Sequence, residues 1–417
     1  MNDAVAHHAA LDARLVEAVR GIRLLQTVSW PAHVQEEFLD GWRRGQAKLP
    51  LIEYPALDFG EVRAELDAIR LAADPDHPLG QYLQRTAESW ATATRLLECA
   101  GSASVTDHSV QLYGRPGDVL PGGEATNLDA ARHFIALADE LDQDLHPDES
   151  DFHIPAATLR DELQAELDRF FVHHKLSVEL DPELIAKAAA GPTRIRLRGG
   201  HAFSDYDRHQ LLEHEAFVHS LTALNGREQP VLKSLARTSP RITATQEGLA
   251  TFAELITGAI DIERMKRISL RILAIDMALR GADFMQVFRF FLDEGQTPSD
   301  SFASAQRIYR GVPLTGKAAF TKDSVYLTGL IGVHTFFRWT LKHRRIRLTR
   351  LLFAGKMTLQ DVLAFEPLFD EGTLAEPLYV PPWVQRAQGL AGMLAFSLFA
   401  NRIRLDRVGA DDLVLSL

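Results

Sequence analysis

Cysteine is almost absent from this chain of 417 residues, in which Cys99 is the only example. A single cysteine excludes an intramolecular disulfide and any metal site built from several thiolates. A metal centre in this chain would therefore need histidine and carboxylate ligands. The low cysteine content also favours a reducing compartment over a secreted location.

Long uninterrupted apolar stretches are missing as well. The most apolar runs, 327–341 and 390–400, are short or interrupted by His334 and Arg338, whereas a membrane-spanning helix needs about 20 consecutive apolar residues. Acidic residues are interspersed with the first apolar residues, which is not typical of a secretory signal. We therefore expect no membrane partner and a cytoplasmic location.

Positive charge is scarce overall, because the formal net charge is −11. The deficit is concentrated in residues 1–150, which hold 25 acidic and 12 basic residues, whereas residues 151–417 hold 31 and 33. An acidic surface repels phosphate groups, so we expect no nucleic-acid partner. The asymmetry also predicts two modules, 1–150 and 151–417, joined by the acidic stretch Asp139–Asp151.

The rest of the composition is that of an ordinary globular protein, with 46% hydrophobic and 24% charged residues. Its apolar periodicity predicts a mainly α-helical protein with a small β-sheet (α+β), in which an acidic helical module precedes the second region. Alternation at 194–198 predicts an edge strand, and the glycine-rich segment 101–125 predicts turns around a short strand at Ser109–Tyr113. The helices are predicted at about 9–29, 60–72, 80–99, 127–141, 156–173, 206–224 and 243–256.

One motif carries candidate chemistry: His214-Glu215-Ala216-Phe217-Val218-His219, with two histidines five residues apart. Two imidazoles can hold zinc, and the adjacent carboxylate can act as a base for the water that attacks the substrate. On an ideal α-helix, residues i and i+5 diverge by about 140°. We therefore predict a π-bulge that returns both histidines to one side. The alternative is two histidines whose polar atoms are satisfied within the core.

A hydrolytic zinc site needs a third protein ligand. Glu247 is the natural candidate, because it lies one turn into the next predicted helix, 28 residues after the second histidine. Glu215 is then the general base. Glu213 and Glu254 are candidates to accept hydrogen bonds from the ligand imidazoles. The small residue Gly248 would let the second helix approach the histidine helix closely.

Further segments resemble a known family. They are 214–219, 221–226, 238–240, 245–250, 307–311 and 320–323. They resemble the bacterial proteins named after a QEGLA motif, which are labelled modulators of flavohaemoglobin expression and are related to the microtubule-associated tyrosine carboxypeptidases. The resemblance implies a gluzincin-like carboxypeptidase core with one Zn²⁺ per chain. It also implies that His214, His219 and Glu247 are the metal ligands and that Glu215 is catalytic.

An exopeptidase that acts at a C-terminus needs a cation for the terminal carboxylate of its substrate. Arg307, Arg310 and Lys322 are the candidates. Tyr309 or Tyr326 could donate a hydrogen bond to the oxyanion. Each of these residues has an alternative role as an ordinary surface or structural side chain.

The predicted function is the zinc-dependent removal of a C-terminal residue, with Tyr and Glu as candidate leaving residues, from a peptide or protein. Two alternatives stay open: a non-enzymatic regulator with a structural metal site, and an intracellular aminopeptidase or dipeptidase. Strand 194–198 is a candidate to pair with an extended peptide. The basic run Lys342–Arg350 predicts a solvated face, an acidic-tail site or a contact with another subunit, so a homodimer is a further expectation.

Overall fold

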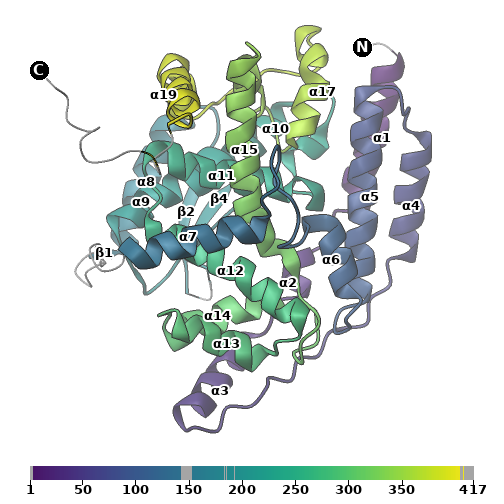
Figure 1. The fold of residues 1–417 in the computed structure, drawn as a ribbon. Helices are drawn as coiled ribbons and strands as arrows, with labels where there is room; N and C mark the ends of the chain where they lie inside the picture. The colour runs from purple at the N-terminus through teal and green to yellow at the C-terminus, as the bar shows by residue number, and fades with distance from the viewer. Residues whose placement is uncertain are drawn as a thin grey trace, which may run out of the picture.

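The computed structural model describes residues 3–141, 153–403 and Arg407, apart from positions 183, 185 and 192. Within these residues the chain is mostly helical with two small sheets (Figure 1), which confirms the predicted mainly α class with a small sheet. The helices of the first 141 residues are α1 (Asp3–Ala18), α2 (Leu24–Thr27), α3 (Ala32–Arg43), α4 (Gly60–Ala72), α5 (Pro78–Glu98), α6 (Val105–Tyr113) and α7 (Asn127–Leu141).

The following region begins with short strands and continues with helices. Up to residue 257 its elements are β1 (Ile154–Pro155), α8 (Ala156–Phe170), β2 (Ser177–Asp181), β3 (Ala188–Ala190), β4 (Arg194–Arg198), β5 (Ala202–Phe203), α9 (Asp205–Leu211), η2 (Leu212–Ser220), α10 (Leu221–Glu228), η3 (Lys233–Ala236), η4 (Pro240–Ile242) and α11 (Thr243–Thr257). After these come α12 (Ile262–Arg280), α13 (Phe284–Asp293), α14 (Pro298–Tyr309), η5 (Thr321–Ser324), α15 (Val325–Lys342), α16 (Arg347–Leu351), α17 (Leu359–Asp370), α18 (Pro382–Gln385) and α19 (Ala387–Ala400).

The strand predicted at Ser109–Tyr113 is wrong, because these residues end helix α6. Val105, Ser109 and Tyr113 are buried on one helical face at intervals of four residues. A run this short does not distinguish a strand from a buried helix by its periodicity. The predicted helix 9–29 also differs, since α1 ends at Ala18 and the separate short helix α2 follows.

The three-stranded sheet has the order β2-β4-β3, so β4 is its central strand and the predicted edge position of 194–198 is wrong. The β2–β4 pair is parallel and the β3–β4 pair is antiparallel. The charged side chains that suggested an edge instead form ion pairs with the parallel neighbour. Arg196 donates to Asp181 at 2.9 Å and Arg194 to Glu179 at 3.5 Å.

The two outer edges of this sheet have different surroundings. Helix α8 covers the outer edge of β2 through Gln164, whose side chain accepts from the Val178 N–H at 2.8 Å and donates to the Leu176 carbonyl at 3.0 Å. The outer edge of β3 faces η2, where the Ala190 N–H donates to Glu215 at 2.9 Å. The sheet therefore presents its β3 edge to the helix that carries the histidine motif.

Buried side chains from both halves of the sequence contribute to one core. Helices α1, α4 and α5 stand together on one side of the molecule, while α3 lies beside α13 and α14 (Figure 1). Trp30 and Phe38 pack against Phe284 and Phe302 with ring centroids 5.1–5.9 Å apart. Of the predicted linker Asp139–Asp151, the first three residues end α7, and residues 142–152 lie outside the described residues.

Helices α11 and α15 cross at two glycines. A Cβ atom added to Gly248 would lie 2.2 Å from the carbonyl carbon of Gly329. Gly248 therefore allows the close approach of α15, whereas the sequence suggested that it would allow the approach of the histidine helix. None of the described helices combines the length and the apolarity that a membrane crossing requires.

Candidate metal centre

The two motif histidines lie on one side of a π-helix. Element η2 has this form over nine residues, and the N–H of Leu221 bonds to the carbonyl of Ala216, five residues earlier. This hydrogen-bond pattern aligns residues five apart, as the motif requires. The imidazole centroids of His214 and His219 are 4.8 Å apart with planes at 84°. The predicted π distortion is confirmed, although it is a full π-helix and not a one-residue bulge.

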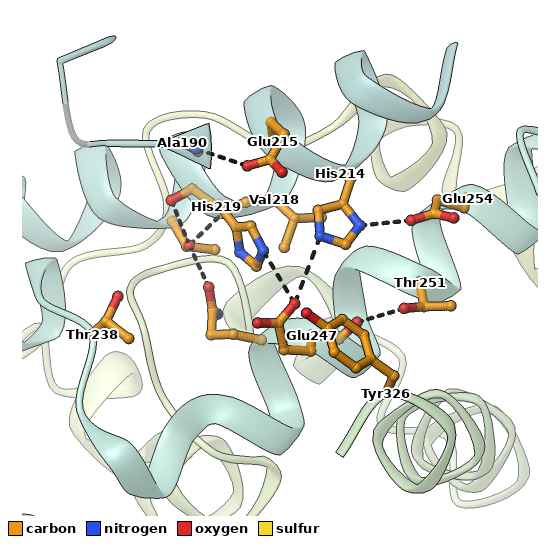
Figure 2. Close-up of polar contacts among 12 residues, drawn as sticks. Ala190, His214, Glu215, Val218, His219, Thr238, Glu247, Thr251, Glu254 and Tyr326 are labelled. Atoms are coloured by element: carbon orange, nitrogen blue, oxygen red, sulfur yellow. Dashed lines mark hydrogen bonds and ion pairs between the residues drawn. The ribbon is translucent and has the colours of Figure 1, made fainter. Parts of the chain in front are cut away.

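Helix α11 brings Glu247 opposite these histidines (Figure 2). Its Oε2 atom is 3.7 Å from the Nε2 atoms of both His214 and His219. The ligand atoms of these residues all lie within 4.8 Å of one another. Ligands placed tetrahedrally at zinc distances of about 2.0–2.2 Å would be roughly 3.3–3.6 Å apart. The three side chains therefore fit a small cation between them.

Lys322 holds the second oxygen of Glu247. Its Nζ atom donates to Oε1 at 3.0 Å, which leaves Oε2 directed toward the histidines. Burial alone would raise the pKa of Glu247, but the Lys322 charge and the two imidazoles hold it well below its usual range. Glu247 is therefore an ionised acceptor, as a metal ligand must be.

Glu254 orients His214 from the other side. The Glu254 Oε1 atom is 2.6 Å from His214 Nδ1, and Arg264 donates to both carboxylate oxygens of Glu254 at 3.1 and 3.2 Å. Burial would raise the pKa of Glu254, but Arg264 and then His214 lower it to about 2. Because an ionised carboxylate only accepts, Nδ1 carries a proton, so Nε2 is the ring nitrogen that can bind a cation.

The site has an excess of negative charge around His214. Burial lowers the pKa of this imidazole, yet Glu247, Glu254 and Glu215 together raise it to about 10. Three carboxylates around one buried imidazole are an environment that favours a bound cation. Glu213 is not part of this group: it lies beside Trp383, and burial raises its pKa to about 7. The ligand-orienting role predicted for Glu213 thus falls to Glu254 alone.

Glu215 lies next to the triad without joining it. Figure 2 shows its carboxylate on the β3 side of His214, where Oε2 accepts the Ala190 N–H. The peptide group of β3 therefore fixes the carboxylate at the border between the triad and the sheet edge. An oriented carboxylate beside a metal site can accept a proton from an attacking water.

Two of the predicted carboxylate-binding cations already have carboxylate partners within the protein. Arg307 forms a bidentate pair with Asp323 at 2.5 and 2.8 Å, and Lys322 is paired with Glu247. Burial would raise the pKa of Asp323, but the charges of Arg307 and Arg271 hold it far below its usual range. Arg310 is partly buried near Arg307. Its burial, followed by the charge of Arg307, lowers its pKa to about 10.

The two predicted oxyanion donors differ in position. The Tyr309 hydroxyl donates to the Ala282 carbonyl at 2.6 Å in the core, so it fastens α14 to the end of α12. Tyr326 projects toward Glu247 in Figure 2. Its ring lies 5.0 Å from Lys322 Nζ, and its hydroxyl accepts from Arg307 at 3.4 Å. Only Tyr326 of this pair therefore lies beside the triad.

A basic cleft of about 560 Å³ adjoins the site and was not predicted from the sequence. Ala190, Thr238 and the apolar residues Val19, Ile22 and Trp90 form part of its wall. Within the described residues the wall contains no acidic side chain. Its cations come from four separate segments that no sequence motif connects, so only the fold reveals them: Arg23, Arg227, Lys233, Arg237 and Lys356.

Comparisons with known proteins agree with this geometry. No curated protein matches the chain. A family model described as microtubule-associated tyrosine carboxypeptidase matches residues 36–402, a span that includes the triad, Glu215 and Glu254. The match confirms the resemblance to these peptidases that the motifs indicated. Because it covers most of the chain, the protein belongs to the microtubule-associated tyrosine carboxypeptidase family.

Proposed function

We propose that this protein is a zinc-dependent carboxypeptidase that removes one residue from the C-terminus of a peptide or protein. The observation that supports this most directly is the convergence of two imidazole nitrogens and one Glu247 oxygen, with the Glu215 carboxylate beside them. His214, His219 and Glu247 would hold the ion. Zinc bound there would supply Lewis acidity that polarises a carbonyl and activates water near neutral pH.

Glu215 would carry the proton during the reaction. Water attacks the carbonyl carbon of the last peptide bond, and Glu215 accepts the proton that the water loses. When the carbon–nitrogen bond breaks, Glu215 returns that proton to the leaving amine. Its hydrogen bond from the Ala190 N–H keeps the carboxylate directed along the sheet edge, where a substrate would lie.

Tyr326 would donate a hydrogen bond to the oxyanion that develops on the attacked carbonyl. Arg307 contacts its hydroxyl and Lys322 lies over its ring, so these two cations stabilise the position of Tyr326. Because Asp323 and Glu247 already neutralise them, we assign Arg307 and Lys322 to supporting the site. The terminal carboxylate then needs another cation.

An extended substrate would pair with the outer edge of β3 instead of with β4. β4 has neighbours on both sides, and α8 covers the outer edge of β2. β3 is the remaining edge, and it ends next to Glu215. Main-chain pairing along an exposed strand edge binds peptides with little dependence on their side chains.

The test is incubation of zinc-loaded protein with a set of peptides that differ in the last residue, followed by mass spectrometry. We expect loss of a single C-terminal residue from some peptides, and no product with Glu215→Gln. Glu213→Gln is the matched control, because Glu213 is on the same helix but lies beside Trp383. Shortening from the N-terminus would support an aminopeptidase, and stoichiometric zinc without cleavage would support a regulator.

A further inference from the structure

Lys356 is the least exposed cation of the basic cleft. The other four basic residues of the cleft are exposed, whereas Lys356 is partly buried. Burial lowers its pKa to about 8, and the charges that act against this effect are those of Glu247 and Glu215. The Lys356 ammonium group is therefore a partly desolvated cation within electrostatic reach of both carboxylates.

The structure holds this lysine in a fixed position. The N–H of Lys356 donates to the Leu235 carbonyl at 2.7 Å. Two side chains fasten the preceding turn: Asn225 of α10, the helix that continues from the histidine helix, donates to the Phe353 carbonyl at 2.7 Å, and Gln229, just after α10, donates to the Ala354 carbonyl at 2.9 Å. The same helix thus positions both the metal ligands and the loop that carries Lys356.

The Lys356 side chain has a hydroxyl partner but no paired carboxylate among the described residues. Its Nζ atom donates to the Thr238 hydroxyl at 3.0 Å. Figure 2 shows Thr238 on the same side of the triad as Ala190 and His219, away from Glu254. By contrast, Lys322, Arg264 and Arg307 each contact a protein carboxylate. A partly desolvated ammonium group beside a hydroxyl is suited to bind an anion.

Arg310 is the competing cation, because its Nε atom has no hydrogen-bond partner among the described atoms. Its position differs from that of Lys356. The charged groups that act on Arg310 are Arg307 and Asp323, followed by Tyr326 and Tyr54. Neither Glu247 nor Glu215 is among its main electrostatic neighbours. Arg310 therefore belongs to the Asp323 cluster, whereas Lys356 faces the carboxylates of the reacting centre.

We infer that Lys356, assisted by the hydroxyl of Thr238, binds the terminal α-carboxylate of the substrate and so restricts the enzyme to C-termini. This inference rests on the proposed carboxypeptidase function and names the residue that determines its exopeptidase character. The apolar wall of Val19, Ile22 and Trp90 lies in the same cleft and would contact the side chain of the leaving residue.

The experiment uses one cleaved peptide, synthesised with a free C-terminal acid and with a C-terminal amide. Binding of both forms is measured on the zinc-loaded Glu215→Gln protein, with and without Lys356→Met. The value of kcat/KM is measured on the unmodified protein and on Lys356→Met, both of which retain Glu215. A charge-assisted hydrogen bond predicts a preference for the acid of roughly 10- to 100-fold, which Lys356→Met should abolish through KM. Lys356→Arg should restore part of the preference.

Arg237→Met is the matched control, because Arg237 is an exposed cation of the same cleft. It should weaken the binding of both peptide forms equally and leave the ratio of their affinities unchanged. Retention of the acid preference in Lys356→Met, or its loss in Arg310→Met alone, would overturn the assignment. Failure of the unmodified enzyme to shorten any peptide would instead reject the proposed function. Zinc content and circular dichroism confirm that each variant is folded.

Discussion

At the scale of single residues, the orientation of the His214 ring is the feature that most affects the candidate metal site. Glu254 accepts from Nδ1 at 2.6 Å and is itself held by Arg264. Removing the negative charge of Glu254 would weaken both the tautomer preference and the basicity of Nε2. Changes to such carboxylate partners typically reduce metal affinity by about 10- to 100-fold.

We therefore predict that Glu254→Gln binds zinc about 10- to 100-fold more weakly than the unmodified protein. The affinity can be measured by competition with a coloured chelator at fixed pH. Glu213→Gln is the control, since this buried carboxyl lies beside Trp383 and not beside a ligand. Equal affinities for the Glu254 and Glu213 variants would show that Glu254 does not tune the site.

The residues of this site differ in how well the sequence identifies them. His214, His219 and Glu247 come from two neighbouring segments, and their spacing is informative because zinc restricts the number and type of its ligands. Lys356 stands in no motif, and its position depends on contacts of its loop with Leu235, Asn225 and Gln229 that only the fold creates. Tyr309 looked equivalent to Tyr326 in the sequence, but its hydroxyl bonds to the Ala282 carbonyl in the core.

At the scale of elements, the crossing of α11 and α15 places Glu247 in the site. Gly248 and Gly329 allow contact between the two backbones, and a methyl group on Gly248 has no space. We predict that Gly248→Ala lowers the free energy of unfolding by at least about 1–3 kcal/mol, the usual cost of overpacking a close contact. It should also weaken zinc binding, because Glu247 is the adjacent residue.

Urea unfolding followed by circular dichroism measures this effect. Gly332→Ala is the matched control, because Gly332 is in α15 but a Cβ atom there meets nothing within 4 Å. That substitution should be neutral or stabilise the helix by up to about 1 kcal/mol. If both variants were equally stable, the close crossing would not be the reason for glycine at position 248.

Element types were easier to predict than element neighbours. The long periodic segments of α5, α8 and α11 are helices near their predicted limits. The strand 194–198 also exists, but its neighbours β2 and β3 are weak sequence signals, since β3 contains only alanines. A strand with charged residues appeared to be an edge because β2, whose Glu179 and Asp181 pair with two of those charges, was not recognised.

The basic run Lys342–Arg350 illustrates the same limit. Arg345 pairs with Glu366, and Arg347 pairs with Asp370 and Glu376. These partners lie in or just after α17, which follows α16 in the chain. Part of the run therefore stabilises the packing of two helices of the same chain. The sequence alone does not distinguish such internal ion pairs from charged side chains that bind another molecule.

At the scale of the whole molecule, a buried carboxylate links the first helix to the loop beside the cleft. Asp12 of α1 accepts hydrogen bonds from the N–H and hydroxyl of Ser234 in η3. Burial raises the pKa of Asp12 from 3.8 to about 6, against the opposing effect of Ser234. Between these two values the native state keeps a proton that the unfolded chain has released, so stability falls as pH rises.

We predict that this contribution disappears in Asp12→Asn. The stability of the variant relative to the unmodified protein should increase by roughly 3 kcal/mol between pH 4 and pH 7, the equivalent of about two pKa units. Urea unfolding at several pH values gives this difference directly. Asp67→Asn on exposed α4 is the control and should give a parallel pH curve. A parallel curve for Asp12→Asn would contradict the prediction.

The charge distribution of the whole chain leads to a final prediction about substrates. A protein of net charge −11 gathers five basic residues in one cleft next to its candidate metal site. The cleft should attract peptides with acidic residues near the C-terminus, although the surface as a whole repels them. We expect a lower KM for such peptides than for neutral analogues, and the advantage should shrink as salt rises from roughly 0.02 to 0.3 M.

The double variant Arg227→Met/Arg237→Met should lose this advantage. The control Lys342→Met/Arg344→Met should keep it, because it removes two exposed cations that are not among those lining the cleft. An equal loss in both variants would mean that the total charge, and not the cleft, attracts the substrate.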